Sequence, residues 1–381
     1  MVKNNQIALE YINANQFAIT SPVSGSLVCR DGTQSLIVRS PNAVSEPALI
    51  NLKKVDTKEE NQADFDLSED GTDTYGKLQV RAAAGALTFE ADITTAEPIW
   101  LMEWKITGLL AKEIIVPALG GQALSERMPE GTTISYKYPF WLNAQFVIGY
   151  SKEGGFIIRS KDESPDLKLI RVTRENNSWT ISYGFEVPGT KSDRHTIHAE
   201  WRIETYRGSW KNAVDNHRQW LENRFELVPK EQHPHYPSWA DDINCVLEIW
   251  GARRDAREPH HTFEQMMDRL VEWRKFHDPT KTLLYLPGFA EKGIDSHAPD
   301  YNPSPQCGGA AKFRKLTEMA RQMGFKVMIH TNVLAMTFTH PRYNEFKDKQ
   351  VIDVFGRRQN WGLDMDGDWL AEPYFAYINP G

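Results

Sequence analysis

The sequence predicts an antiparallel β domain followed by the first part of a (β/α) barrel. Short apolar runs with partial period-two alternation, separated by Gly, Pro, Asn and Asp, fill residues 1–207. In residues 238–381, apolar runs alternate with helical patterns, which favours parallel strands joined by helices. Residues 208–237 hold a helix and a proline-containing linker between the two domains.

Composition and charge narrow the class of protein. The 381 residues are 40% hydrophobic and 25% charged, as in ordinary globular proteins. The net charge of −7 disfavours nucleic acid or an anionic membrane as the main partner. The three cysteines form neither a disulfide framework nor a metal-binding CxxC pair. The N-terminus lacks a signal-peptide pattern, and no apolar run is long enough to span a membrane, so we expect a soluble, cytoplasmic chain.

The first domain reads as β almost throughout. Many short strands with few helices predict a large antiparallel sandwich, which we interpret as a structural platform rather than a catalytic domain. A helix follows, with Trp210, Ala213, Val214, His217 and Leu221 on one stripe. We expect His217 to be a satisfied core or interface histidine.

The second domain begins with an apolar run at residues 242–250, and further runs follow at 281–289 and 325–332. The last two runs are typical of strands buried on both faces. Helices are predicted between the runs, one opening with a capping box at Thr262 and Gln265, and one ending at Gly324. The order fits either a (β/α) barrel or an open doubly wound sheet. Nucleotide-binding and serine-hydrolase glycine motifs are absent from the sequence, which favours the barrel.

The barrel is predicted to be incomplete. A closed (β/α)8 barrel typically takes about 250 residues. Only three clear strands are visible here, so we expect the C-terminal part of the barrel to lie outside this sequence. Such a chain would expose strand edges, and we expect it to oligomerise or to require the missing half.

Candidate functional residues follow the predicted strands, because barrels carry their chemistry at the carboxyl ends of strands. Carboxylates, His and Asn bind sugar hydroxyls, and Trp and Tyr stack on sugar rings. The candidates include Glu248, Asp295, His297 and His340, but for any single Asp a surface or turn role is the commoner one. The predicted substrate-binding residues are Trp250, Tyr285, Asp300, Tyr301, His330 and Asn332.

No metal or other cofactor is assigned from the sequence. The Asp364, Asp366 and Asp368 run resembles a calcium loop only superficially, because its glycine is misplaced for an EF-hand. The pairs His260–His261 and His233–His235 do not have the spacing of a zinc site.

Several segments together resemble a known kind of protein. These segments are residues 201–222, with their G-x-W and R-x-W pieces, residues 298–332, with D-Y-x-P, G-G and G-F-x-V, and the terminal YINPG. The chain resembles bacterial glycoside hydrolase-like proteins that have a galactose-mutarotase-like β-supersandwich before a (β/α)8 TIM-type barrel. Their relatives include endo-α-N-acetylgalactosaminidase-type enzymes and uncharacterised barrel families. The resemblance implies a carbohydrate substrate, and it implies catalytic carboxylates on strands beyond Gly381.

Three hypotheses for function remain open. The first is a glycoside hydrolase, or the N-terminal portion of one, that uses carboxylate acid/base chemistry on a glycan or oligosaccharide. The second is a non-catalytic carbohydrate-binding or scaffold protein with a truncated glycosidase architecture. The third is an open α/β domain of unrelated function.

Overall fold

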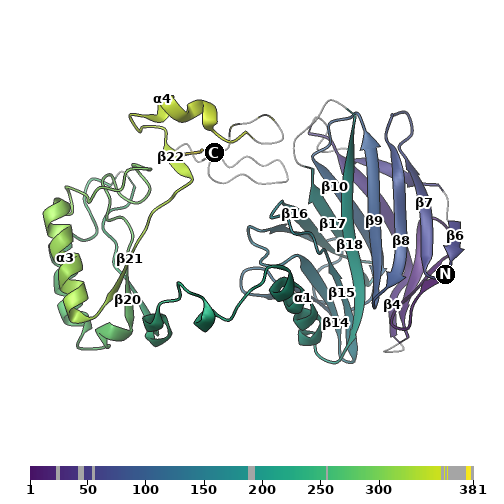
Figure 1. Cartoon of the computed structure of the whole chain (residues 1–381), viewed down its shortest axis with the longest axis horizontal. Helices are drawn as coiled ribbons and strands as arrows, with labels where there is room; N and C mark the ends of the chain where they lie inside the picture. The colour runs from purple at the N-terminus through teal and green to yellow at the C-terminus, as the bar shows by residue number, and fades with distance from the viewer. Residues whose placement is uncertain are drawn as a thin grey trace. The chain divides into compact units, whose positions relative to one another are not determined.

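The computed structural model describes residues 1–22, 26–41, 47–53, 56–187, 194–254, 256–352, 356, 358 and 375–378. The chain divides into two compact units, Met1–Leu227 and Val228–Gly381, each described here by itself (Figure 1). None of the helices in the described part has the length and apolar character needed to cross a membrane.

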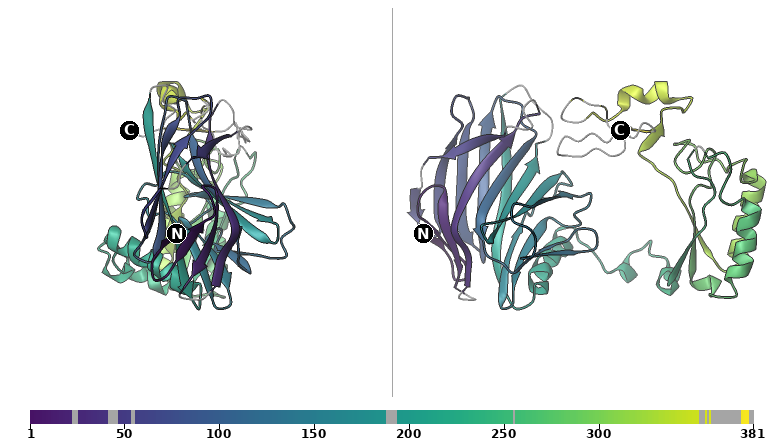
Figure 2. Two further views of the ribbon diagram at one scale, coloured as in Figure 1. Left: turned by 90° about the vertical axis from the view of Figure 1, so that its right-hand side faces the viewer. Right: turned by 180° about the vertical axis from the view of Figure 1, so that it is seen from behind.

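The first unit consists of antiparallel strands and one helix (Figure 2). Its elements are β1 (Val2–Lys3), β2 (Ala8–Tyr11), β3 (Gln16–Ser21), β4 (Ser26–Arg39), β5 (Ala48–Leu52), β6 (Asp56–Glu59), β7 (Gln62–Ser68), β8 (Tyr75–Ala83), β9 (Ala86–Thr95), β10 (Leu101–Leu109), β11 (Glu113–Val116), β12 (Gln122–Ser125), β13 (Thr133–Tyr138), β14 (Phe146–Ser151), β15 (Gly154–Arg159), β16 (Lys168–Glu175), β17 (Ser178–Glu186), β18 (His195–Arg207) and α1 (Lys211–Arg224).

Two runs of paired strands form the layers of this unit. One run places β10 between β4 and β17, and continues from β17 to β16 and β13. The other run continues from β7 through β8, β9, β18 and β15 to β14. Strand β5 pairs with β4 of the first run and with β7 of the second. The prediction of a largely antiparallel β domain is therefore confirmed.

Aromatic side chains from both layers meet in the core. Trp104 on β10 lies 5.1 Å from Trp201 on β18 and 4.5 Å from Phe89 on β9, measured between ring centroids. All three side chains are fully buried. Alternation along each strand directs these residues inward, and such aromatic pairs contribute about 1 kcal/mol each beyond the area they bury.

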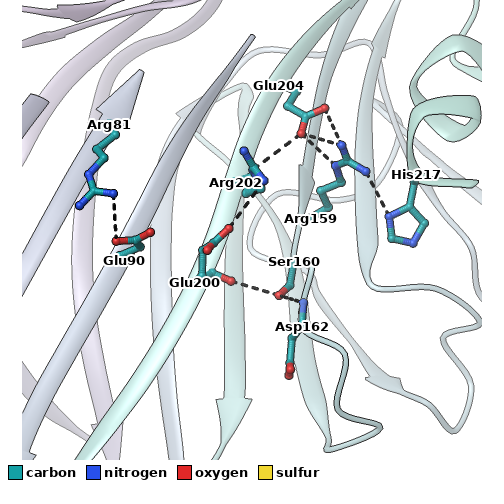
Figure 3. Close-up of polar contacts among 9 residues, drawn as sticks. All are labelled: Arg81, Glu90, Arg159, Ser160, Asp162, Glu200, Arg202, Glu204 and His217. Atoms are coloured by element: carbon teal, nitrogen blue, oxygen red, sulfur yellow. Dashed lines mark hydrogen bonds and ion pairs between the residues drawn. The ribbon is translucent and has the colours of Figure 1, made fainter. Parts of the chain in front are cut away.

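A buried ion pair lies beneath helix α1 (Figure 3). Arg159 on β15 donates to the Glu204 carboxylate on β18 through Nε at 3.0 Å and Nη2 at 2.7 Å. Its Nη1 lies 3.5 Å from Nδ1 of His217 on α1. Since a guanidinium only donates, His217 accepts through Nδ1 and is neutral. His217 is buried, as predicted, and also packs edge-on against Phe146.

The second unit contains short helices and short strands. Its elements are η1 (Lys230–Gln232), η2 (Ser238–Asp242), β19 (Cys245–Glu248), α2 (Phe263–Trp273), η3 (Pro279–Lys281), β20 (Thr282–Leu286), α3 (Gly309–Met323), β21 (Lys326–Ile329), β22 (Ala335–Thr337), α4 (Tyr343–Phe346), η4 (Lys347–Lys349) and β23 (Phe375–Tyr377).

Strands β19, β20 and β21 form a three-stranded parallel sheet, in chain order. This confirms the predicted parallel pairing. Helix α2 begins with the predicted capping box, in which the Thr262 hydroxyl accepts the Gln265 N–H and the Gln265 side chain accepts the Thr262 N–H. Helix α3 ends at Gly324, which is left-handed with φ 100°. Both helix boundaries follow from local sequence.

The two helices cover one face of this sheet. Leu284 and Leu286 of β20 pack with Met266 and Leu270 of α2 and with Leu316 of α3. Figures 1 and 2 show α3 running along one side of the strands.

The opposite face of the sheet is partly open among the described residues. Val246 and Met328 have 58% and 41% of their surface exposed. The prediction that strand 325–332 is buried on both faces is therefore wrong. The reason is that no described element covers the face away from the helices.

Candidate functional site

The carboxyl end of the parallel sheet gathers polar side chains on one face. Glu248 at the end of β19 is the register partner of Tyr285 on β20, and Tyr285 is the partner of Met328 on β21. Residues two apart in a strand share a face, so His330 projects on the same side as Met328. This face is the one that helices α2 and α3 do not cover.

A hydrogen-bonded chain of side chains links this strand end to the following loop. The Tyr285 hydroxyl lies 2.7 Å from Nδ1 of His330, and Nε2 of His330 lies 3.1 Å from Oδ2 of Asp295. The other carboxylate oxygen of Asp295 lies 3.2 Å from the hydroxyl of Tyr301. Four side chains from three separate segments thus form one continuous polar network.

The hydrogen bonds of the network determine which ring nitrogen of His330 is protonated and which groups act as donors. An ionised carboxylate only accepts, so Nε2 of His330 holds a proton that it donates to Asp295. Nδ1 of the neutral ring then accepts a hydrogen bond from the Tyr285 hydroxyl. Burial, followed by the negative charges of Glu248 and Asp295, raises the pKa of Tyr285, which therefore stays a donor at neutral pH.

Tyr301 joins the network to the segment after β21. Its hydroxyl accepts the backbone N–H of Asn332 at 2.6 Å. Burial raises the pKa of Tyr301 to about 12, so its proton remains available for Asp295 or for the Asn332 carbonyl, each at 3.2 Å. The Asn332 side-chain oxygen accepts the N–H groups of Leu334 and Ala335, and so holds a turn.

Trp250 lies beside the same strand end. Its indole N–H donates to the Glu248 carboxylate, and its carbonyl oxygen lies 3.1 Å from Nδ1 of His261. The ring is only partly buried. Trp250 is thus connected to the Tyr285 face through Glu248.

The predicted site residues therefore divide into groups. Tyr285, Tyr301, His330 and the backbone of Asn332 share one network. Trp250 is linked to that face by Glu248, whereas Asp300 belongs to another cluster, where its Oδ2 lies 3.1 Å from Nε2 of His340. The predicted substrate-binding set omitted Asp295, which connects His330 to Tyr301. Asp295 and Asp300 lie in the same loop, and nothing in the sequence indicates that they have different partners. The fold brings Asp295 to His330 and Asp300 to His340.

The second cluster has the composition of a metal site. One ring nitrogen each of His297 and His340 and a carboxylate oxygen of Asp300 lie within 4.8 Å of one another. Two histidines and one carboxylate are a ligand set used for zinc and iron. The acidic run at residues 364–368, for which no metal was assigned, lies outside the described residues.

The first unit also has a pocket, of about 490 Å³, beside residues 160–168. Its charged groups are largely satisfied by one another: the buried Lys168 ammonium contacts Asp162 at 2.5 Å and the Ser164 carbonyl at 2.8 Å. Glu186 at its edge accepts the Leu167 N–H. These internal pairs explain the pocket as a structural feature of the strand connection.

Comparison with known proteins gives a likeness in structure only. No family model matches the sequence, and no curated protein matches it. The solved structure of α-N-acetylgalactosaminidase NagBb from Bifidobacterium bifidum with GalNAc superposes with a TM-score of 0.74 at 12% identity, covering 99% of this chain and 64% of NagBb. Its complex with Gal-NHAc-DNJ gives a TM-score of 0.74 at 13% identity, with the same coverage. The chain has a glycoside hydrolase-like fold.

Partial coverage and low sequence identity limit what these structural comparisons establish. The chain spans less than two thirds of the length of NagBb. A GH36 α-galactosidase, AgaB from Geobacillus stearothermophilus, is 11% identical over 98% of this chain and 50% of its own, with a TM-score of only 0.42. At such identities the comparison establishes the fold, and function requires evidence from the site.

Proposed function

We propose that this chain is a glycoside hydrolase, or the N-terminal portion of one, acting on a glycan that carries α-linked N-acetylgalactosamine or galactose. The observation that carries the proposal is the likeness of 99% of the chain to NagBb, which is an α-N-acetylgalactosaminidase. The polar network at the strand ends supports it, because it presents hydroxyl, imidazole and carboxylate groups beside a partly exposed Trp250.

In this proposal the network binds the sugar. Asp295 and Glu248 accept hydrogen bonds from sugar hydroxyls. Tyr285 and His330 fix the orientation of Asp295, and the Trp250 indole fixes that of Glu248. The Trp250 ring offers an apolar face to the carbon side of a pyranose. Glycoside cleavage needs two carboxyl groups flanking the bond, one as acid and one as base or nucleophile. We assign neither role to a described residue.

We further propose that β19, β20 and β21 are consecutive strands of a (β/α) barrel. Their parallel order, with α2 and α3 on one face, is the arrangement of barrel strands. The apolar side chains of Val246 and Met328 on the other face would then point into the barrel interior. In a protein that includes the remaining barrel strands, slow hydrogen exchange at the backbone amides of both β19 and β21 is expected. Rapid exchange of both strands would contradict it.

The experiment for function uses a panel of nitrophenyl glycosides and titration calorimetry with the same sugars. We expect turnover of α-N-acetylgalactosaminides or α-galactosides, and weaker binding in the Asp295→Asn variant. The Asp241→Asn variant, altered at an exposed carboxylate in η2, is the control. Sugar binding without hydrolysis would support the alternative, a non-catalytic carbohydrate-binding protein. Folded protein that neither binds nor cleaves any glycoside would overturn both.

A further inference from the structure

We propose that His297, Asp300 and His340 bind a divalent transition-metal ion of the zinc class, which holds the loop after β20 to the segment that follows β22. This inference is independent of the glycosidase proposal. It concerns the second polar cluster, in which His340 joins His297 and Asp300 from a segment 40 residues after Asp300.

The geometry of the cluster suits a small ion. Zinc binds imidazole nitrogen and carboxylate oxygen at roughly 2.0–2.2 Å, so ligand atoms around it lie roughly 3–3.5 Å apart. The His340 Nε2 to Asp300 Oδ2 distance of 3.1 Å has this spacing. The three ligand atoms all lie within 4.8 Å of one another, so small side-chain rotations would complete the site.

His297 shows that the cluster is incomplete as it stands. Its Nδ1 is buried and has no hydrogen-bond partner. Its Nε2 lies 3.8 Å from a carboxylate oxygen of Glu291. Histidines that ligate metals characteristically direct their other ring nitrogen at a carboxylate, which fixes the ring and raises its basicity. An ion at Nδ1 would provide the missing partner. The carboxylate of Glu291 would then orient the ring of a metal ligand, as carboxylates commonly do.

The surroundings provide both burial and access. The His340 side chain is 3% exposed, whereas that of Asp300 is 54% exposed, so an ion could enter from the Asp300 side. Three protein ligands leave a coordination position for water.

To bind an ion through Nε2, His340 must change its tautomer. Its Nδ1 accepts the Arg342 backbone N–H at 3.2 Å, so without metal Nε2 holds the proton and donates it to Asp300. An ion between Nε2 and Asp300 replaces that proton, and the ring proton moves to Nδ1. The cost is two hydrogen bonds, one from the Arg342 N–H and one to Asp300, against two or three metal–ligand bonds gained.

The ion would reinforce a link already present between the two segments. The Thr337 N–H donates to the Ala298 carbonyl at 3.1 Å, and the Thr337 hydroxyl donates to it at 3.2 Å. Ligands at His297 and Asp300 lie on either side of Ala298, and His340 lies three residues after Thr337. A bound ion would thus fasten the segment to the loop that also carries Asp295 and Tyr301.

The test is calorimetric titration of metal-stripped protein with zinc chloride, together with visible absorption spectra after addition of cobalt(II). We expect one ion per chain and the intense ligand-field bands of a four-coordinate cobalt site. Asp300→Asn keeps a hydrogen-bond acceptor for His340 but removes an anionic ligand, and should weaken zinc binding at least about 10-fold. His297→Ala should do the same.

His235→Ala is the matched control, because His233 and His235 are exposed neighbours that could bind zinc adventitiously. This variant should bind zinc as the parent does. Undiminished binding by Asp300→Asn and His297→Ala, loss of binding in His235→Ala, or no binding by the parent protein would each overturn the proposal.

Discussion

The Tyr285 hydroxyl and Nδ1 of His330 lie 2.7 Å apart, joining side chains of two adjacent parallel strand ends. Tyr285 lies within β20, and His330 directly follows β21. The bond fixes the imidazole so that its other nitrogen faces Asp295. An exposed strand end thus becomes an ordered polar surface.

Replacing Tyr285 by Phe tests whether this order matters for sugar binding. The change leaves His330 free to turn away from Asp295, and we expect about a 10-fold loss of sugar affinity, equivalent to about 1.4 kcal/mol. Calorimetry with the best-bound sugar measures it. Tyr75→Phe, at an exposed position on β8, is the control and should have no effect. Equal sugar affinities in both variants would show that the network does not contribute to sugar binding.

A second prediction concerns the stability that the buried Arg159–Glu204 ion pair contributes; both ion pairs compared here are drawn in Figure 3. Arg159→Met leaves the Glu204 carboxylate largely buried without its hydrogen-bonded cation, and Nε of Arg202 lies 4.0 Å from it. Breaking a buried ion pair by removing one partner costs about 3–5 kcal/mol of unfolding free energy. Arg81→Met breaks a more exposed pair with Glu90 at 3.8 Å and should cost less than about 1 kcal/mol. Urea unfolding of both variants measures the difference, and similar losses would contradict it.

His217 predicts how stability depends on pH. Burial, followed by the charges of Arg159 and Lys161, lowers the pKa of His217 from 6.5 to about 4. Between these values the unfolded chain binds a proton that the folded chain does not. Stability should therefore fall as pH drops from about 6.5 to about 4, by up to about 3 kcal/mol.

The His217→Gln variant separates this contribution from that of the acidic groups. A glutamine side chain does not titrate, so the variant should lose less stability over the same pH interval than the parent does. Thermal or urea unfolding at several pH values measures both proteins. Parallel stability curves for the two proteins would show that His217 is not the responsible group.

Gly288 should be sensitive to the smallest possible side chain. Its φ is 69°, and a Cβ there would lie 2.1 Å from the Ala252 carbonyl oxygen. Backbone cannot move aside easily, so Gly288→Ala should cost about 3 kcal/mol or more and distort the strand end. Gly309→Ala has a similar φ of 71° but open space around the new carbon, and should cost only about 1 kcal/mol. Chemical denaturation distinguishes the two, and equal costs would refute the overlap.

Some features of this protein are determined by local sequence. The Thr262–Gln265 capping box begins α2, Gly324 ends α3, and the alternation in residues 1–207 forms antiparallel strands, because each depends on neighbours only a few residues apart. The same local patterns predicted three parallel strands with polar residues at their ends. That much follows from backbone geometry and side-chain period.

Tertiary structure alone decided which polar residues meet. Asp295 and Asp300 occupy one loop and are chemically equivalent in the sequence, yet the fold directs Asp295 to His330 and Asp300 to His340. His297 and His340 have no recognisable metal-site spacing, and chain folding brings them together. The physical reason is that a side-chain cluster depends on where loops return, and loop paths are fixed by long-range contacts such as Thr337 with Ala298, which no local period encodes.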